Sequence, residues 1–284
     1  MFNISFILVL FLYQLSVGIM LTLAVMPLKV VDRKFYQLSC GLSSILMAIA
    51  LGFALYYPFE LPKNFGVSLE QLGMMPQVVL GIFMAYLALI FFTYVRLRLK
   101  QVDHAKFWVR LGAGLGTLGL VVQGLVYRPA SLYGGLKSVV MPLDFVTAAM
   151  FLGVFMLAMV FGHWYLVQAM PKRLLKRMTE ILILILVVRL LVVGGSLWVY
   201  ASQVQGGAEA ISTLMDIWHG HGMFFWQRIL TGLGIPLILS YMIYSTAKMG
   251  ANQSATGLLY VGVVFVIIGE IISKYMFMMS GIPI

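Results

Sequence analysis

The sequence predicts an all-α integral membrane protein of about eight transmembrane helices, in two four-helix halves with both termini on the outer side of the membrane. Of its 284 residues, 62% are hydrophobic and only 10% are charged, whereas about 25% of residues are charged in an average soluble domain. Apolar runs of the roughly 20 residues that a membrane-spanning helix needs recur along the whole chain. The breaks between them are short, so residues 1–284 form a single membrane domain.

Pro and Gly residues and charge clusters divide the hydropathy pattern into eight spans. The expected spans are Ile4–Met26, Tyr36–Tyr57, Met75–Val95, Phe107–Tyr127, Val139–His163, Met178–Ala201, Gly222–Ala247 and Thr256–Met279. No basic residue precedes the first run and no small-residue cleavage pattern follows it, which favours a first span over a removable signal peptide. The single Cys40 lies in an apolar run, so neither a disulfide nor a thiolate metal site is predicted from this chain alone.

Basic residues gather in alternate loops and set the expected orientation. The loops after spans 1, 3 and 5 carry Lys29, Arg33, Lys34, Arg96, Arg98, Lys100, Lys106, Lys172, Arg173, Lys176 and Arg177. The opposite loops carry only Lys63, Arg128 and Lys137. Since cytoplasmic loops hold the excess of Lys and Arg, both termini are expected outside a cell inner (cytoplasmic) membrane, on the periplasmic side in a Gram-negative bacterium. The net charge of +10 therefore belongs to helix ends, and no nucleic-acid partner is expected.

A short internal echo favours two halves, residues 1–137 and 138–284. Met26-Pro27 followed by Lys29 ends the first span, and Met170-Pro171 followed by Lys172 ends the fifth. Both elements leave the membrane on the basic side, as two parallel repeats would. An ordinary helix exit would give the same pattern, so the duplication stays one of two interpretations.

Ionisable side chains inside the apolar spans are the candidate functional residues, because each costs a few kcal/mol in the hydrocarbon core. Glu270 and Lys274 are four residues apart on one helix face. With about 1.5 Å of rise per residue, Asp144 and Arg228 fall in the same outer half of the membrane, whereas Arg189 lies near the middle. We predict that the first four share one pocket, although Glu270–Lys274 and Asp144–Arg228 could equally be structural ion pairs.

Polar residues at the outer ends of the spans would complete such a pocket. They are Tyr56, Tyr57, Tyr127, Asp216, His219 and His221. Carboxylate, His and Tyr groups beside an apolar wall suit a quinone, menaquinone or ubiquinone, whose head needs hydrogen bonds and a proton acceptor. The alternative is that the two histidines belong to an exposed interfacial loop.

On the basic side, His163 and Glu180 with Arg189 further in could begin a proton path. The alternative is that Glu180 complements the helix dipole and that His163 belongs to an interfacial anchor. A haem b site would need His pairs at matched depth on facing helices. The histidines lie at opposite surfaces, His104 and His163 on the basic side and His219 and His221 on the outer side. No intrinsic haem is therefore expected.

The last two spans resemble a known family. The final span reads Gly269-Glu270-Ile271-Ile272-Ser273-Lys274, followed by Tyr275 and Phe277, and the span before it contains Trp226-Gln227-Arg228-Ile229. These motifs are similar to those of the last two helices in the membrane-anchor subunits of DMSO reductase, which are related to the polysulfide reductase anchor. The resemblance implies a subunit that oxidises or reduces menaquinone or ubiquinone near the outer face and holds no haem or iron–sulfur cluster itself.

The resemblance also implies a partner, an extrinsic iron–sulfur subunit, or a multihaem cytochrome as in related complexes. One departure limits it. The DMSO reductase anchor has a functionally important His at the outer end of span 2, where this chain reads Tyr56-Tyr57-Pro58. A Tyr can still donate a hydrogen bond to a quinone carbonyl, but a mechanism that depends on the His does not carry over.

The leading hypothesis is therefore a quinone-interacting membrane anchor subunit of a respiratory oxidoreductase, in which proton translocation is optional. In it, Glu270 and Asp144 exchange protons with quinone, and Arg228 and Lys274 orient the ring. One alternative is a secondary transporter or ion-translocating subunit, for which the helix break would fall at Gly232, Gly234 and Pro236. Another is a purely structural membrane anchor.

Overall fold

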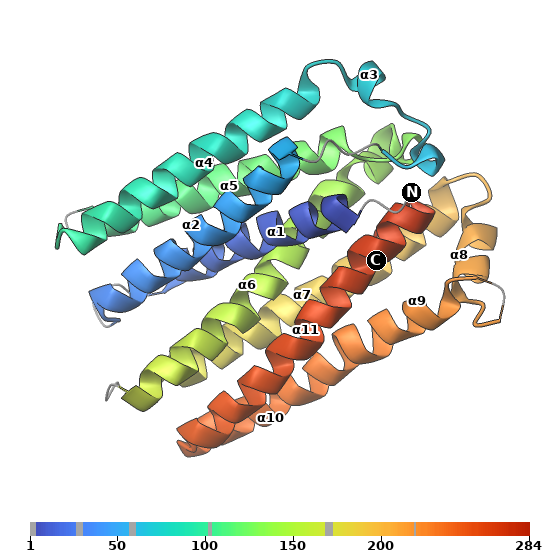
Figure 1. Cartoon of the computed structure of the whole chain (residues 1–284). Coiled ribbons are helices and arrows are strands. Elements are labelled where there is room, and N and C mark those ends of the chain that lie inside the picture. Colours follow the sequence, from blue (N-terminus) through green and yellow to red (C-terminus); the bar gives the residue numbers. More distant parts are fainter. Residues whose placement is uncertain (1–3, 27–30, 57–60, 102–103, 168–172, 219) are drawn as a thin grey trace.

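Eight long helices lie side by side in the computed structural model of the chain (Figure 1). The structure describes residues 4–26, 31–56, 61–101, 104–167, 173–218 and 220–284. The long helices are α1 (Ile4–Val25), α2 (Arg33–Tyr56), α4 (Met75–Arg98), α5 (Ala105–Val126), α6 (Val140–Val167), α7 (Arg173–Gln203), α11 (Asn252–Ser280) and a composite of α9 (Gly222–Ile229), η4 (Leu230–Gly234) and α10 (Ile235–Met249). Short helices are η1 (Lys63–Phe65), α3 (Leu69–Leu72), η2 (Ala130–Leu132), η3 (Gly135–Val139) and α8 (Gly207–Met215).

Within the described ranges, eight helices are long and apolar enough to cross a membrane, and no strand is present. The predicted fold class, an all-α multi-pass membrane protein, is therefore confirmed. Each long helix matches one predicted span apart from a few residues at its ends. The start of α1, the end of α11, α3 and α8 lie at one end of the molecule, opposite the helix ends that carry Arg33, Arg98 and Arg177 (Figure 1).

The helices form two groups of four (Figure 1). We call α1, α2, α4 and α5 the first group, and α6, α7, α9–η4–α10 and α11 the second group. The groups meet along α1 and α6, where the backbones touch. A Cβ atom on Gly18 would lie 1.8 Å from the carbonyl oxygen of Ala149, and one on Gly153 would lie 2.0 Å from the carbonyl carbon of Gly18. Small residues four apart on α6 thus allow the close crossing that membrane helices favour.

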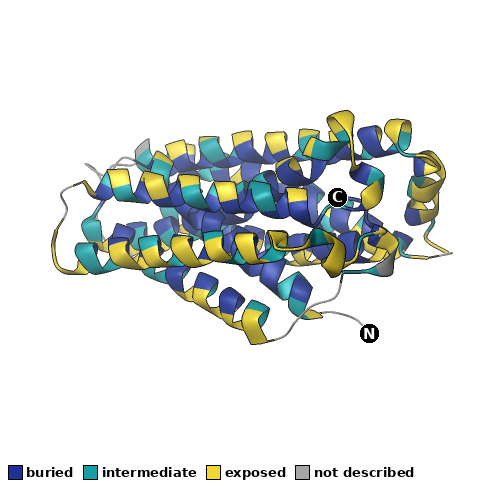
Figure 2. Ribbon diagram, turned by 90° about the horizontal axis from the view of Figure 1, so that it is seen from above, coloured by how far each residue is buried: buried dark blue, intermediate teal, exposed yellow. Residues whose placement is uncertain are grey.

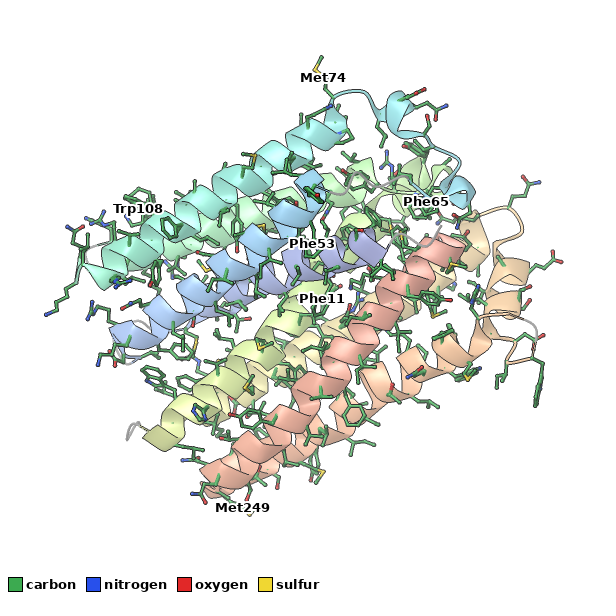
Figure 3. All side chains as sticks on the ribbon, viewed as in Figure 1. Phe11, Phe53, Phe65, Met74, Trp108 and Met249 are labelled. Atoms are coloured by element: carbon green, nitrogen blue, oxygen red, sulfur yellow. The ribbon has the colours of Figure 1, made fainter. Side chains whose placement is uncertain are left out.

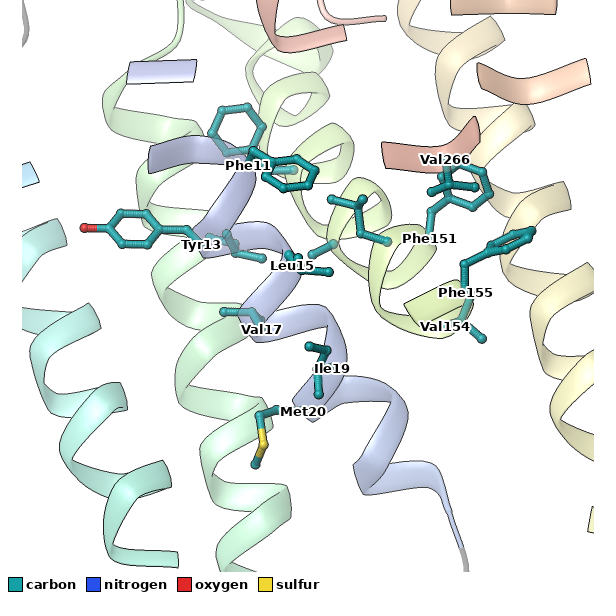
Figure 4. Close-up of a cluster of buried hydrophobic side chains, with 14 of the residues drawn as sticks. Phe11, Tyr13, Leu15, Val17, Ile19, Met20, Phe151, Val154, Phe155 and Val266 are labelled. Atoms are coloured by element: carbon teal, nitrogen blue, oxygen red, sulfur yellow. The ribbon is translucent and has the colours of Figure 1, made fainter. Parts of the chain in front are cut away.

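Helix α1 is apolar on every side and mostly buried, as expected for a helix at the centre of a bundle. In Figure 4, Leu15 of α1 points towards α6, whereas Phe151 and Phe155 project from the opposite side of α6, beside Val266 of α11. Tyr13 points the other way, and its ring stacks on Phe83 of α4 with ring centres 4.1 Å apart. One face of α1 therefore packs against the second group, and the other face packs against the first group.

Exposed residues run along the outer faces of the long helices, while buried residues line the interior (Figure 2). Many of the exposed side chains are large and apolar, including Ile45, Leu191 and Ile238. Such a surface suits hydrocarbon and not water. Met74 and Met249 mark the two opposite ends of the bundle in Figure 3.

A polar triad joins three helices inside the first group. The hydroxyl oxygens of Ser16 and Ser43 lie 2.9 Å apart, and the Tyr86 hydroxyl lies 3.0 Å from that of Ser43. Each hydroxyl has a single proton, which it gives either to a neighbouring hydroxyl or to a backbone carbonyl. The carbonyl acceptors are that of Ser16 for Tyr86, at 3.1 Å, and each other's for the two serines. The triad satisfies polar groups that no water can reach in a membrane.

Candidate functional site

Five ionisable side chains form one buried cluster in the second group. We call it the charge cluster; it consists of Asp144 of α6, Arg189 of α7, Arg228 of α9 and Glu270 and Lys274 of α11. None of these side chains is more than 6% exposed. The prediction that four of them meet is borne out by their geometry, and the cluster joins four helices at one point.

Glu270 is the centre of the charge cluster. Its Oε1 accepts hydrogen bonds from Arg228 Nη2 at 2.7 Å and from Arg189 Nε at 3.3 Å. Its Oε2 accepts from Arg189 Nη2 at 3.4 Å and from the Lys274 ammonium group. A carboxylate offers about four lone-pair sites. These four hydrogen bonds fill them, so Glu270 gains a further partner or a proton only when one of these bonds breaks.

Asp144 is bound from one side. Arg189 Nη1 lies 2.5 Å from Asp144 Oδ1 and also donates to the Asp144 carbonyl oxygen and the Thr147 hydroxyl, both at 3.2 Å. The remaining lone pairs of the Asp144 carboxylate have no hydrogen-bond donor among the described residues. Asp144 therefore keeps lone pairs that no described donor occupies, in contrast to Glu270.

Two expectations about these residues need correction. Arg189 was expected near the membrane middle on a path from the basic side, but it lies in the charge cluster and links both carboxylates. The alternative interpretation pairs Asp144 with Arg228 as a structural ion pair, but the observed partner of Asp144 is Arg189, whereas Arg228 pairs with Glu270. The i, i+4 pair of Glu270 and Lys274 is confirmed. Sequence spacing locates partners on one helix, but not partners on another, because the rotation of each helix about its axis is set by packing.

The charge cluster has more cation than anion. Three cationic and two anionic side chains leave one positive charge in excess. Within the part of the chain that the structure describes, Arg228 Nε and Nη1 are buried without a hydrogen-bond partner. Arg228 thus presents donors that an additional acceptor could use.

The helix that carries Arg228 is irregular. Directly after α9, residues Leu230–Gly234 form a single π-helical turn, η4. A Cβ atom on Gly269 of α11 would lie 2.4 Å from the Gly232 Cα atom and 3.0 Å from Arg228 Nη1. The two glycines thus let α11 approach η4 closely enough to seat the arginine. Such π-bulges recur at functional sites, and this one falls on the predicted helix break at Gly232 and Gly234.

A separate cavity of about 320 Å³ lies within the first group, between α1, α2, α4 and α5. We call it the first-group cavity; its lining residues are Phe6, Val9, Tyr13, Ala54, Pro76, Gln77, Val79, Leu80, Gln123 and Tyr127. Gln123 is 1% exposed, and its side-chain Oε1 has no hydrogen-bond partner among the described residues. A buried polar atom without a partner is rare in proteins, and Gln123 places such an acceptor beside the cavity.

Tyr127, one of the predicted quinone-binding residues, also lines the first-group cavity. It follows directly after α5 and packs edge-on against Phe6, with ring centres 5.9 Å apart. Burial raises the pKa of the Tyr127 phenol to about 12. The hydroxyl therefore stays protonated throughout the physiological pH range.

The other predicted outer residues do not gather at one site. Tyr56 ends α2 and is exposed, and Asp216 follows α8, where its carboxylate accepts from the backbone N–H of Trp218 at 2.9 Å. His221 Nδ1 lies 3.4 Å from the hydroxyl of Tyr275, which neighbours Lys274 along α11. Tyr57 and His219 lie outside the described residues.

The three residues of the predicted proton path are not connected. His163 Nδ1 lies 3.1 Å from the Tyr260 hydroxyl near the basic end. Glu180 forms a half-exposed pair with Lys176 at 3.6 Å. Because α7 begins at Arg173, Glu180 lies beyond its first turn, and the alternative interpretation that Glu180 complements the helix dipole is wrong. Nine residues, about 13 Å of helical rise, separate Glu180 from Arg189, and no hydrogen bond links the two in the described ranges.

Known proteins do not identify the chain. No family model matches the sequence, and no curated protein is similar enough to count as a relative. The likeness to the DMSO reductase anchor therefore stays a prediction, and the functional argument rests on the charge cluster and the first-group cavity.

Proposed function

We propose that this protein is the quinone-reactive membrane subunit of a respiratory oxidoreductase in the cell inner membrane, and that the quinone head binds in the first-group cavity. The observation that carries the proposal is that Tyr127, with its phenol, and Gln123, whose Oε1 has no partner among the described residues, line the same cavity. A quinone carbonyl needs a donor, and a hydroquinone hydroxyl needs an acceptor. A phenol donates, and a carboxamide both donates and accepts, so these two side chains can hold either redox state.

The walls of the first-group cavity suit the rest of such a ligand. A volume of about 320 Å³ lies at the lower end of the range for small-molecule pockets, which fits a ring with a tail that extends outside. Ala54 of α2 and Gln77 of α4 line the cavity without being buried. The cavity therefore communicates with the outside of the bundle between these helices, where an isoprenoid tail would meet lipid.

The position of the first-group cavity favours exchange of electrons with an extrinsic partner. Its residues come from the start of α1, the end of α2, the start of α4 and the end of α5. These helix ends lie together near the end of the bundle that the two chain termini mark (Figure 1). An iron–sulfur subunit or multihaem cytochrome bound at that end would lie next to the bound quinone.

In this proposal the charge cluster holds the second group together. Glu270 of α11 pairs with Arg189 of α7 and Arg228 of α9 and so connects these three helices. Arg189 also pairs with Asp144, which adds α6 to the same contact. Proton exchange between Glu270 and a quinone would first have to break one of its four hydrogen bonds. We therefore assign quinone binding to the first group and scaffolding to the second.

Titration of the purified full-length chain with a fluorescent quinol analogue of the hydroxyquinoline N-oxide class tests the proposal. Gln123→Leu and Tyr127→Phe should each weaken binding about tenfold, since loss of a buried hydrogen bond costs roughly 1–3 kcal/mol. Gln227→Leu, the same substitution on an exposed position of α9, should bind like the wild type. Equal affinity of all four proteins would contradict the proposal.

A second candidate function, ion or proton translocation by the charge cluster, is favoured by one observation. The π-helical turn η4 directly follows Arg228 and places the predicted helix break against Gly269. Transporters place such breaks at their binding sites. Acidification of proteoliposomes that contain this chain alone, lost in Asp144→Asn, would favour translocation over the quinone-reactive subunit.

A further inference from the structure

A second cavity, larger than the first-group cavity, lies on the outward-facing side of the first group. It measures about 1310 Å³ and runs between α2 and α4. We call it the α2–α4 groove. Its lining residues are Arg33, Lys34, Gln37, Leu38, Gly41, Leu42, Ser44, Ile45, Ala48, Leu51, Gly52, Leu55, Met84, Leu87, Ala88, Phe91, Tyr94 and Trp164. The groove does not share a lining residue with the first-group cavity.

The α2–α4 groove is polar at one end and apolar along the rest of its length. Arg33, Lys34, Gln37 and Trp164 contribute hydrogen-bond donors at the basic end of α2. The Trp164 ring packs edge-on against Phe35, and its indole Nε1 is buried without a hydrogen-bond partner among the described residues. Arg33 is partly engaged, because its Nη1 donates to the carbonyl oxygen of Leu97. The side chains beyond Gln37 are apolar or small apart from Ser44 and Tyr94.

The α4 wall of the α2–α4 groove matches one membrane leaflet in length, whereas its α2 wall, from Arg33 to Leu55, rises about 33 Å. Helix α4 forms its second wall from Tyr94 to Met84, ten residues or about 15 Å of rise. That length is half of a hydrocarbon core of about 30 Å. A Cβ atom on Gly41 would lie 3.1 Å from the Tyr94 ring. Helices α2 and α4 are therefore in contact at this level, which is where the acyl chains of a bound lipid would begin.

We propose that the α2–α4 groove binds an anionic phospholipid of the leaflet on the basic side of the protein. The phosphate would accept from Lys34, with Arg33 and the Trp164 ring nearby, and the acyl chains would lie along α2 and α4. Basic pockets between membrane helices on the cytoplasmic side bind anionic lipid head groups in this way. Charge complementarity selects the anionic lipid, because a zwitterionic head group would bring a cation to Arg33 and Lys34.

Native mass spectrometry of the full-length protein, delipidated in mild detergent and mixed with phosphatidylglycerol or phosphatidylcholine, tests this. The wild type should retain phosphatidylglycerol in preference. Lys34→Ala should weaken its binding about fivefold, the attraction expected of one basic residue at a membrane surface. Lys248→Ala, an exposed lysine at the end of α10, is the matched control and should bind like the wild type.

A second variant tests the apolar part of the groove without touching a charge. A Cβ atom on Gly52 would meet no atom within 4 Å, so Gly52→Phe should fold and should displace lipid by filling the groove. Equal retention of both lipids by the wild type, or unchanged phosphatidylglycerol binding in both Lys34→Ala and Gly52→Phe, would overturn the proposal. A third outcome would also overturn the proposal: the wild type shows no lipid preference, and Gly52→Phe dissociates a dimer or releases a bound partner helix. The groove would then be a protein contact.

Discussion

Arg189 and Glu270 meet in parallel, side-on geometry, although 81 residues separate them in the sequence. Arg189 Nε lies 3.3 Å from Glu270 Oε1, and Nη2 lies 3.4 Å from Oε2. This two-point contact fixes the rotation of α7 relative to α11, which an apolar contact between smooth helices would leave free. Buried ion pairs add little net stability but fix one arrangement over others. We therefore regard the pair as the element that orients the second group.

Replacement of Glu270 by Gln should destabilise the protein. The charge cluster would then hold three cations and a single carboxylate, and breaking a buried pair from one side costs about 3–5 kcal/mol. From the sequence alone, we would expect this variant to assemble normally and to lose only electron transfer. The structure instead predicts a loss of stability, which the unfolding temperature of the variant in detergent measures.

The matched control for Glu270→Gln restores the charge balance. In Glu270→Gln combined with Lys274→Met, two cations face one carboxylate, the same excess as in the wild type. The double variant should recover part of the lost unfolding temperature. A single variant as stable as the wild type, or a double variant less stable than the single, would show that charge balance does not govern this site.

Replacement of Gly18 by Leu should separate the two groups. A side chain there would overlap the Ala149 carbonyl oxygen, only 1.8 Å from the Cβ position. Overpacking costs about 1–3 kcal/mol where neighbouring side chains can move. The helix backbone at Ala149 moves less easily than a side chain, so we expect a loss of stability at or above the upper end of this range. Gly114→Leu on α5 is the control, because no atom lies within 4 Å of that Cβ position. If both variants unfold at the wild-type temperature, the close contact between α1 and α6 at Gly18 is refuted.

Replacement of Tyr86 by Phe should weaken the first group modestly. The variant loses the hydroxyl that bonds Ser16 and Ser43 but leaves those two serines bonded to one another. Hydrogen bonds between membrane helices are worth about 0.6 kcal/mol on average and up to about 1.7 kcal/mol. Unfolding in detergent should show a loss in that range, with Tyr241→Phe, at an exposed position, as the neutral control.

The number and limits of the spanning helices could be predicted from the sequence because hydropathy is a local property of each segment. The membership of Asp144, Arg228, Glu270 and Lys274 in one cluster was also predictable, since depth along a helix follows from residue spacing. The observed pairs, Asp144 with Arg189 and Arg228 with Glu270, could not be predicted from the sequence. Arg189 has a long, flexible side chain, and its reach to Asp144 depends on packing between α6 and α7, which spacing does not encode.

The first-group cavity was the part that sequence reasoning missed. Tyr127 was predicted as a quinone contact, but Tyr13 and Gln123 were not, because neither is charged and each sits in an apolar span as a core residue would. One signal was available. An uncharged amide inside a membrane helix needs a hydrogen-bond partner, and both Gln14 and Gln123 could have been marked on that ground.

Labelling with a photoreactive azidoquinone most directly tests the central claim that quinone binds in the first group and not at the charge cluster. The full-length protein in lipid nanodiscs is irradiated with the probe, digested, and the labelled peptides are mapped by mass spectrometry. We expect labels on the α1 segment around Tyr13 and on the end of α5 around Gln123 and Tyr127, removed by excess menaquinone. Labels confined to α9 and α11, beside Arg228 and Lys274, would contradict the account.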